Sequence, residues 1–353
     1  MIGAGPGHRM IERYEREDLM GQFTVVVGQL VGFFIMLMIG YGCVRMRFYG
    51  KVALDGMCAL LLNVLIPVLV FANAVDGATR AQLAANWGVM LLSAVMYLLL
   101  IVLFRLVAWL LRLRGSHGRV FQATMIFGNA GFLGIPLIMA LFPENGAIWV
   151  ALMSIVDQSL QWTYGVWLCE PMDSERNVRA CDCRAAGRET SPARSVGAVL
   201  RRFVNPALCA IVLSLALIML GVTVPSMLLT PLHTIGAMAT PLSLIYLGGL
   251  FALTRWWGVL RRPELYVGMG VKMLCFPIAL HALLTAIAAA APALPVTADM
   301  IAVISLVAGL PTMTAIAMFA ARRDNMPDYA TGFVLVSTLF SLCSLTVVSA
   351  VIF

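Results

Sequence analysis

Charge is scarce in this sequence. Asp, Glu, Lys and Arg together make up 12% of the 353 residues, whereas a typical soluble domain is about 25% charged. Apolar residues make up 61% of the chain, and the mean hydropathy is +0.93. A soluble core is too small to bury this much apolar surface. The composition therefore excludes a soluble globular domain and predicts that lipid surrounds most of the chain, and the absence of strand-like alternation argues against a barrel.

Chemical motifs are equally sparse. No group of His, Cys and carboxylate residues has the spacing of a metal site, and neither a P-loop nor a glycine-rich nucleotide-binding loop occurs. We therefore expect no metal, no cofactor, and neither enzymatic nor ATP-driven chemistry by this chain alone. Cys181 and Cys183 lie in a polar segment that has no histidine, and we predict reduced, unliganded thiols there. The basic residues are not interleaved with aromatic residues, so nucleic acid is not an expected partner.

What the sequence has instead is a series of long apolar runs. A helix that crosses a bilayer needs roughly 20 mostly apolar residues. Ten runs are close to or above this length, so we predict an all-α polytopic membrane protein with ten transmembrane helices. The predicted spans are residues 22–43, 52–75, 87–113, 120–142, 146–168, 203–221, 231–253, 264–290, 299–321 and 330–353.

Lys and Arg residues are distributed unevenly among the predicted loops. Eighteen of the 24 follow odd-numbered spans, and four lie in the N-terminal tail and in the loops after even-numbered spans. Basic loops remain on the cytoplasmic side of a membrane. We therefore predict a multi-pass protein of the cell membrane with both termini outside. No cleavable signal peptide is expected, because residues 1–21 carry mixed charge and precede a run too long for a signal sequence.

The longest polar segment divides the spans into five and five. We predict an outward-facing tail at 1–21, a five-helix repeat at 22–168, a cytoplasmic loop at 169–202 and a second five-helix repeat at 203–353. An odd number of spans in each half turns the second half upside down relative to the first, as in many secondary transporters. Ten spans can also be halved without homology between the halves, and the periodicity leaves both interpretations open.

The fourth span contains helix-breaking residues near mid-membrane. Gly131, Gly134 and Pro136 follow Asn129 closely. Glycine weakens a helix, and proline removes a backbone N–H and clashes with the preceding turn. An unpaired backbone group in hydrocarbon costs several kcal/mol, so an unwound stretch must lie beside protein or a water-filled cavity. We predict an interruption near 131–136, with the Asn129 amide available for hydrogen bonding.

The ninth span is the fourth of the second half, and it has a matching signal. Gly309 and Pro311 lie near its middle, followed by Thr312 and Thr314. Two interrupted spans in corresponding positions are the best sequence indication of a transporter binding site. The half-helix that follows each break exposes free N–H groups and a partial positive charge, which favour an anion. The two breaks therefore predict an anion site where these spans meet.

Two ionisable residues lie inside predicted spans and are functional candidates. Asp157 lies midway along span five, followed by Gln158, and Gln161 lies one helical turn further on the same face. Burial favours the neutral form of a carboxylate, so Asp157 is a candidate proton carrier, with a structural hydrogen bond as the equal alternative. Lys272 lies two turns into span eight. We expect its long side chain to extend toward the cytoplasmic surface, although it could instead face an acid in the core.

At these residues the sequence resembles a known transporter family. The order and spacing of several short segments along nearly the whole chain from about Gly21 are similar to the auxin efflux carrier family, which includes plant PIN-type carriers and bacterial malate/malonate-type permeases. The segments are Leu62-Asn63 with Pro67, Gly128-Asn129 through Gly134-Ile135-Pro136-Leu137, Gln158 and Trp162 to Glu170, Asn205-Pro206, Pro241-Leu242 with Gly248, and Leu310-Pro311 through Arg322, Tyr329 and Ser337-Thr338-Leu339.

The resemblance implies a fold and a mechanism. It implies a ten-helix inverted repeat shared with sodium/proton antiporters and bile-acid symporters, in which broken helices four and nine cross. Spans 1, 2, 6 and 7 would form a scaffold that makes a homodimer, and the remaining spans would form a moving transport domain, as in an elevator. Plant members have Leu-Pro where this chain has Phe127-Gly128, and Gln where it has Thr312. These departures argue against auxin as the substrate.

Together these features predict a secondary carrier for a small organic anion such as a carboxylate, either uncoupled or proton-coupled. A sodium-coupled symporter of the same fold is the alternative. A membrane-embedded enzyme is disfavoured, because a single carboxylate among amides is no catalytic set. The predicted substrate-binding residues are Asn129, Gly131, Gly134, Pro136, Gln158, Gln161, Pro311, Thr312 and Thr314, and the proton-coupling candidates are Asp157 and Lys272.

Overall fold

The computed structural model describes residues 28, 31–77, 79–142, 144–172, 206–222, 224–291 and 295–352. The predicted tail at 1–21 and most of the predicted loop at 169–202, including Cys181 and Cys183, lie outside these residues.

The described chain is built from helices, which include four π-helical turns (η1, η2, η3 and η5) and one 3-10 helix (η4). In chain order they are the helix Val31–Arg45, α2 (Lys51–Leu60), η1 (Leu61–Leu65), α3 (Ile66–Gly77), α4 (Arg80–Ala85), α5 (Trp87–Leu110), α6 (Gly115–Ile126), η2 (Ala130–Gly134), α7 (Ile135–Leu141), α8 (Gly146–Leu160), η3 (Gln161–Gly165), α9 (Val166–Cys169), α12 (Pro206–Leu220), α13 (Ser226–Ala237), α14 (Ala239–Leu253), η4 (Trp256–Arg261), α15 (Pro263–Gly270), η5 (Val271–Cys275), α16 (Phe276–Ala290), α17 (Ala298–Ala308), α18 (Thr314–Arg322) and α19 (Pro327–Ile352).

Within the part of the chain that the structure describes, five continuous helical segments are long and apolar enough to cross a membrane, judged by length and composition. They are Lys51–Asp76, Trp87–Leu110, Ser226–Leu253, Pro263–Ala290 and Pro327–Ile352. Shorter apolar helices occur at Val31–Arg45, Pro206–Leu220 and Ala298–Ala308. On α5, an exposed apolar stripe of Leu98, Val102 and Leu106 repeats every helical turn. Such a stripe is the surface expected of a helix that faces lipid, so the chain is a helical membrane protein.

Three prolines that follow a π-helical turn are accommodated without breaking the helix. Pro67, Pro136 and Pro277 each stand two residues after the end of a π turn, in α3, α7 and α16. Proline cannot donate to the carbonyl four residues back, and its ring clashes with that carbonyl. A π turn shifts the local bonding pattern by one residue. The helical backbone continues through each of these prolines.

The fourth predicted span is interrupted, but upstream of the predicted place. Helix α6 ends at Ile126, and Phe127–Asn129 are not helical. Helical backbone resumes at Ala130 and continues through Pro136. The predicted break near 131–136 is therefore wrong, because the π turn η2 accommodates Pro136. The ninth span is interrupted where expected, between α17 and α18 at Gly309–Met313.

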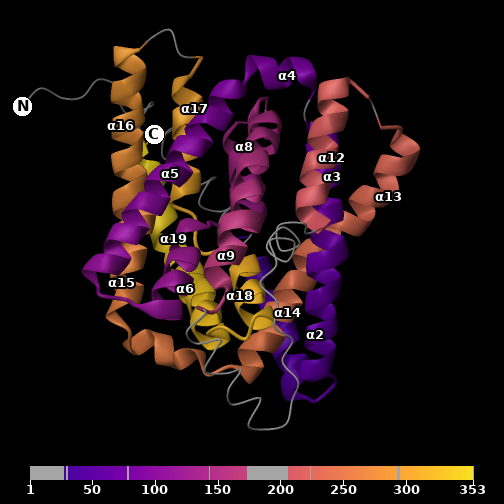
Figure 1. Ribbon diagram of the computed structural model, residues 1–353, viewed down its shortest axis with the longest axis vertical. Helices are drawn as coiled ribbons and strands as arrows, with labels where there is room; N and C mark the ends of the chain where they lie inside the picture. Colours follow the sequence, from indigo (N-terminus) through magenta and orange to yellow (C-terminus); the bar gives the residue numbers. More distant parts are fainter. Residues whose placement is uncertain are drawn as a thin grey trace, which may run out of the picture.

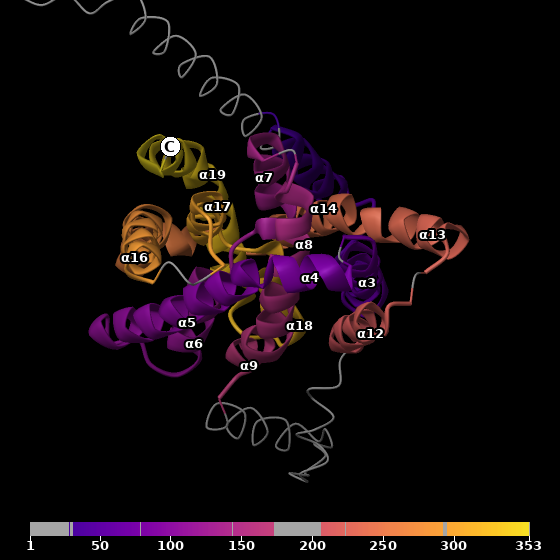
Figure 2. The ribbon, with the colours of Figure 1, turned by 90° about the horizontal axis from the view of Figure 1, so that it is seen from above.

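The helices form two groups with a middle region between them (Figures 1 and 2). On one side lie α2, α3, α12, α13 and α14, and on the other lie α5, α15, α16, α17 and α19. The middle contains α8, α9 and α18, and α4 lies across one end of the bundle. Most of the residues that the sequence marks as candidates belong to the middle elements and to the two breaks.

Two glycines allow one pair of helices to touch backbone to backbone. A Cβ atom at Gly248 in α14 would overlap the carbonyl oxygen of Leu37, and one at Gly40 would overlap that of Ile245. Small residues permit such close approach between helices in membranes. The helix Val31–Arg45 and α14 therefore pack at a distance that depends on these glycines.

Candidate functional site

The two interrupted segments meet and pair with each other. Gly128 and Thr312 form an isolated antiparallel bridge. The Asn129 N–H donates to the Pro311 carbonyl at 2.7 Å, and the Met313 N–H donates to the Phe127 carbonyl at 3.1 Å. Non-helical backbone in a membrane must have its polar groups satisfied by protein or water. The two interrupted segments provide hydrogen-bond partners for some of each other's backbone groups. This pairing holds the two segments together where they cross.

Side chains of the crossing reinforce it. The Thr312 N–H donates to Ser337 Oγ at 3.1 Å, and the Thr312 hydroxyl donates to the Thr124 carbonyl at 2.8 Å. A Cβ atom added at Gly134 would lie 2.9 Å from Leu310 Cδ1. Thr312 and Gly134 therefore act as structural residues of the crossing, one by tying neighbouring helices and the other by allowing close packing.

A partly open cavity of about 150 Å³ lies beside the crossing. Its walls come from α3, α8, α12, α14 and the segments that follow the two breaks. This volume is sufficient for several water molecules or a small organic molecule. The polar residues that line it are Asn73, Ser154, Asp157, Gln158, Ser214, Thr240, Ser243 and Thr314.

Both half-helix N-termini reach this cavity. Ala130 and Gly131, which begin η2, line one part of the wall. Thr314 and Ala315, which begin α18, line another together with Met313, the residue before that helix. The first turn of a helix has N–H groups without intrahelical partners and carries a partial positive charge. Two such ends on one cavity make it electrostatically suited to an anion.

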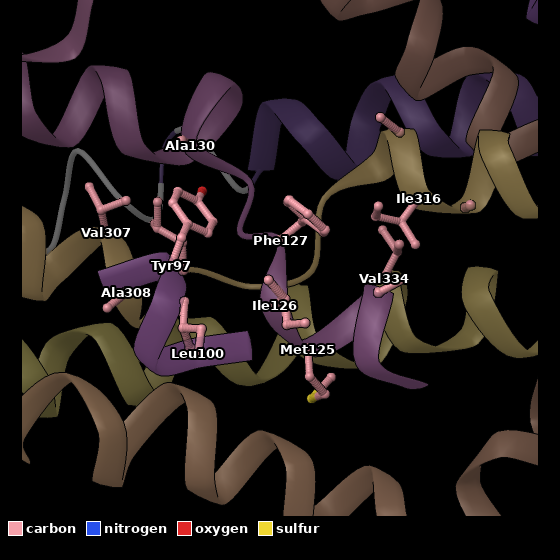
Figure 3. Packing of buried hydrophobic residues seen from close by; sticks show 14 of the residues in the cluster. Tyr97, Leu100, Met125, Ile126, Phe127, Ala130, Val307, Ala308, Ile316 and Val334 are labelled. Atoms are coloured by element: carbon pink, nitrogen blue, oxygen red, sulfur yellow. The ribbon is translucent and has the colours of Figure 1, made fainter. Parts of the chain in front are cut away.

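Asp157 is the one Asp, Glu, Lys, Arg or His among the described residues that line the cavity, and two donors bond its carboxyl group. Its side chain is 2% exposed. The Tyr97 hydroxyl donates to Asp157 Oδ1, and Gln158 Nε2 donates to Oδ2 at 3.3 Å. Trp162 Nε1 in turn donates to Gln158 Oε1 at 3.1 Å. Figure 3 shows Tyr97 beside Phe127, and the centroids of their rings lie 5.9 Å apart.

Lys272 does not extend to the membrane surface, so that expectation is wrong. Its side chain is 1% exposed, and its Nζ donates to the Phe127 carbonyl at 3.2 Å. Phe127 caps the C-terminal end of α6, where unpaired carbonyls carry partial negative charge. Lys272 also interacts electrostatically with Asp157. The broken helix thus offers the ammonium a partner inside the protein, which an unbroken helix would not provide.

The cavity brings together four of the predicted site residues, namely Gly131, Asp157, Gln158 and Thr314. Among the described residues that line it, Asn129, Gly134, Gln161, Pro311, Thr312 and Lys272 do not occur. Asn129 and Gln161 are fully buried, and the Gln161 amide has no hydrogen-bond partner among the described residues. Pro311 lies in the crossing, and Pro136 is the second residue of α7. A direct role of Asn129 in binding remains a prediction.

Several residues of the site were missed by sequence reasoning. Asn73 on α3, Ser214 on α12, and Thr240 and Ser243 on α14 form the wall opposite the crossing. Each is an isolated polar residue in an apolar run, a weak signal that is also common on ordinary helices. Tyr97, the partner of Asp157, lies 60 residues away in sequence. Among the described residues, no group of three or more His, Cys, Asp or Glu residues could hold a metal ion.

The fold and this site define a class of protein, a helical membrane protein with a cavity at two broken helices, as in transporters. A family model described as membrane transport protein matches residues 25–349. The chain therefore belongs to this membrane transport family, and the predicted resemblance to the auxin efflux carriers is confirmed. No curated protein matches the chain closely enough to add a substrate.

Proposed function

We propose that the protein is a secondary carrier of a small organic anion, such as a carboxylate, and that the cavity beside the crossing is its binding site. The observation that carries this proposal is the pair of half-helix N-termini, at Ala130 and Thr314, that open onto one cavity. An anion there would be bound by backbone N–H groups and by neighbouring hydroxyls and amides. No Lys, Arg or His occurs among the described residues that line the cavity, so the helix ends would supply the positive potential.

The wider architecture in this proposal is a ten-helix inverted repeat that works by an elevator motion. The matching breaks in the fourth and ninth predicted spans support the repeat. The position of the cavity supports the motion, because its walls belong to different parts of the bundle: α3, α12 and α14 to one group of helices, and α8 and α18 to the middle region. Sliding of one part against the other would expose the site to alternate sides of the membrane.

Proton coupling through Asp157 is the second part of the proposal. An ionised carboxylate in the wall repels a bound anion, and a proton on Asp157 removes that repulsion. Anion and proton would therefore bind together more favourably than the anion alone. The alternative of sodium coupling predicts that transport depends on sodium and not on pH, so both ions are varied in the same assay.

The test fills the cavity from the wall opposite the crossing. Ser243→Phe places a ring in the cavity, whereas Thr234→Phe places the same ring on the exposed face of α13. The Ser243 hydroxyl donates to the Thr240 carbonyl of α14, and the Thr234 hydroxyl donates to the Thr230 carbonyl of α13. Each variant therefore loses one hydrogen bond within its own helix.

We expect Ser243→Phe to abolish uptake of organic acids into proteoliposomes and Thr234→Phe to retain it. Substrate is identified first by the shift in thermal stability that organic acids cause in the wild-type protein. Equal uptake by both variants, with both folded, would place the binding site elsewhere.

A further inference from the structure

A second feature lies at the end of α5, away from the cavity, and does not depend on what the protein transports. Trp109 and Leu110 end this membrane-length helix and are 74% and 71% exposed. Arg112 and Arg114 follow directly and are also exposed. Together with Leu113, these residues line a surface hollow of about 370 Å³. The hollow therefore has an apolar part on the helix and a doubly cationic part on the turn that follows it.

The turn holds the two arginines in defined positions. The Leu113 N–H donates to the Ala108 carbonyl at 2.9 Å, and the Arg112 N–H donates to the Trp109 carbonyl at 3.0 Å. Arg112 has a φ of 53°, which is the left-handed region where helices usually end with glycine. A long cationic side chain thus occupies a position where glycine would be less strained. Attraction to the negative end of α5 favours a cation here, but it does not require a hollow with an apolar floor.

We propose that this hollow binds the headgroup of an anionic phospholipid, with the phosphate between Arg112 and Arg114 and an acyl chain against Trp109 and Leu110. Guanidinium groups match phosphate oxygens in pairs. Basic residues just beyond the end of a membrane-spanning helix attract anionic lipids. A free phosphate ion would use the two arginines but not the exposed tryptophan and leucine, so the apolar half of the hollow favours a lipid.

The experiment measures retention of single lipids by the purified full-length protein in native mass spectrometry. Phosphatidylglycerol and phosphatidylcholine with the same acyl chains are compared. We expect preferential retention of phosphatidylglycerol, and we expect Arg112→Gln with Arg114→Gln to weaken that binding by roughly tenfold or more. Arg112→Gly removes the charge and also relieves the left-handed backbone, so it should weaken lipid binding in a protein at least as stable as the wild type.

The control is the pair Arg45→Gln with Arg47→Gln. Arg47 lies in the turn that follows the helix Val31–Arg45 and has a φ of 61°. The Phe48 N–H donates to the Cys43 carbonyl at 2.9 Å, so this turn has the same geometry. The control should retain wild-type binding of phosphatidylglycerol. Equal loss in both pairs would reduce the effect to general charge attraction and overturn the proposal. Equal retention of both lipids, or full displacement of the lipid by inorganic phosphate, would overturn it as well.

Discussion

At the scale of single residues, the cavity depends most on Asp157. Because an ionised carboxylate repels a bound anion, its protonation state would control binding. Asp157→Asn preserves the shape and keeps the side chain permanently neutral. We therefore expect this variant to exchange substrate across the membrane of proteoliposomes while net transport loses its dependence on pH.

The control for Asp157→Asn is Asp299→Asn. Asp299 is an exposed carboxylate in the first turn of α17 and does not line the cavity. Flux is measured at several pH values with the membrane potential clamped, and the control should follow the wild-type pH profile. A wild-type profile in Asp157→Asn would exclude this residue as the proton carrier and leave uncoupled transport as the simpler mechanism.

The buried side chain of Lys272 leads to a separate prediction about stability. Lys272→Met keeps an unbranched apolar side chain but removes one of the two donors to the Phe127 carbonyl, which retains the Met313 N–H. A single hydrogen bond contributes about 0.5–1.5 kcal/mol to stability. We expect Lys272→Met to lower the free energy of unfolding by this amount in detergent, while Lys51→Met at an exposed position changes it little. Equal stability of the two variants would show that the bond between Lys272 and Phe127 contributes nothing measurable.

These residues also show which parts of the site can be predicted from the sequence and which cannot. Asp157 and Gln158 could be selected from composition alone, because polar and charged residues are rare inside apolar spans. The position of Lys272 could not be predicted, since its partner Phe127 lies 145 residues away. The same is true of the wall on α12 and α14, where single hydroxyls become part of a site only through packing between distant segments.

At the scale of helices, proline and glycine determine where the chain bends and how closely it packs. The sequence predicted which two spans are interrupted, because Gly and Pro cluster in both. It placed the first interruption too late, because a π turn before Pro136 keeps the helix intact and no residue pattern marks that turn. The unwound residues are instead Phe127–Asn129, which pair with the second break.

Close packing of helices gives a prediction at this scale. Gly248→Ala adds a Cβ atom that meets the backbone of Leu37, so the helix Val31–Arg45 and α14 must move apart. Overpacking of this kind costs about 1–3 kcal/mol, and we expect a lower melting temperature in detergent. Gly56→Ala in α2 is the control, because nothing lies within 4 Å of the added atom. It should be neutral or stabilising, since alanine favours a helix. Unchanged stability of Gly248→Ala would contradict the close approach.

At the scale of the whole molecule, the direction of transport decides whether the membrane potential drives the movement of an anion or opposes it. Moving one charge across 100 mV changes its free energy by about 2.3 kcal/mol. With the cell interior negative, a monoanion leaves the cell downhill without coupling, whereas its import must be driven. The proposed orientation places both termini outside, and it places the end of α3 near Asn73 on the outer side.

The final prediction tests this orientation with two asparagines on one continuous helical segment. Asn73 is exposed and lines the cavity, whereas Asn63 lies ten residues earlier, roughly 15 Å along the helix, where its Oδ1 accepts from Arg322 at 3.3 Å. In a chain whose own cysteines are replaced, Asn73→Cys should react with a membrane-impermeant thiol reagent added outside intact cells. Asn63→Cys should not react from that side.

Bound substrate should slow the labelling of Asn73→Cys, because the two would compete for the same cavity. A second measurement uses the native Cys181 and Cys183, which lie in the predicted cytoplasmic loop, with all other cysteines replaced. They should react only when the cells are opened. Labelling of Asn73→Cys from the cytoplasmic side alone would invert the proposed orientation. The Asn73 end of the cavity would then face the cytoplasm. The uneven distribution of Lys and Arg among the loops would need another explanation.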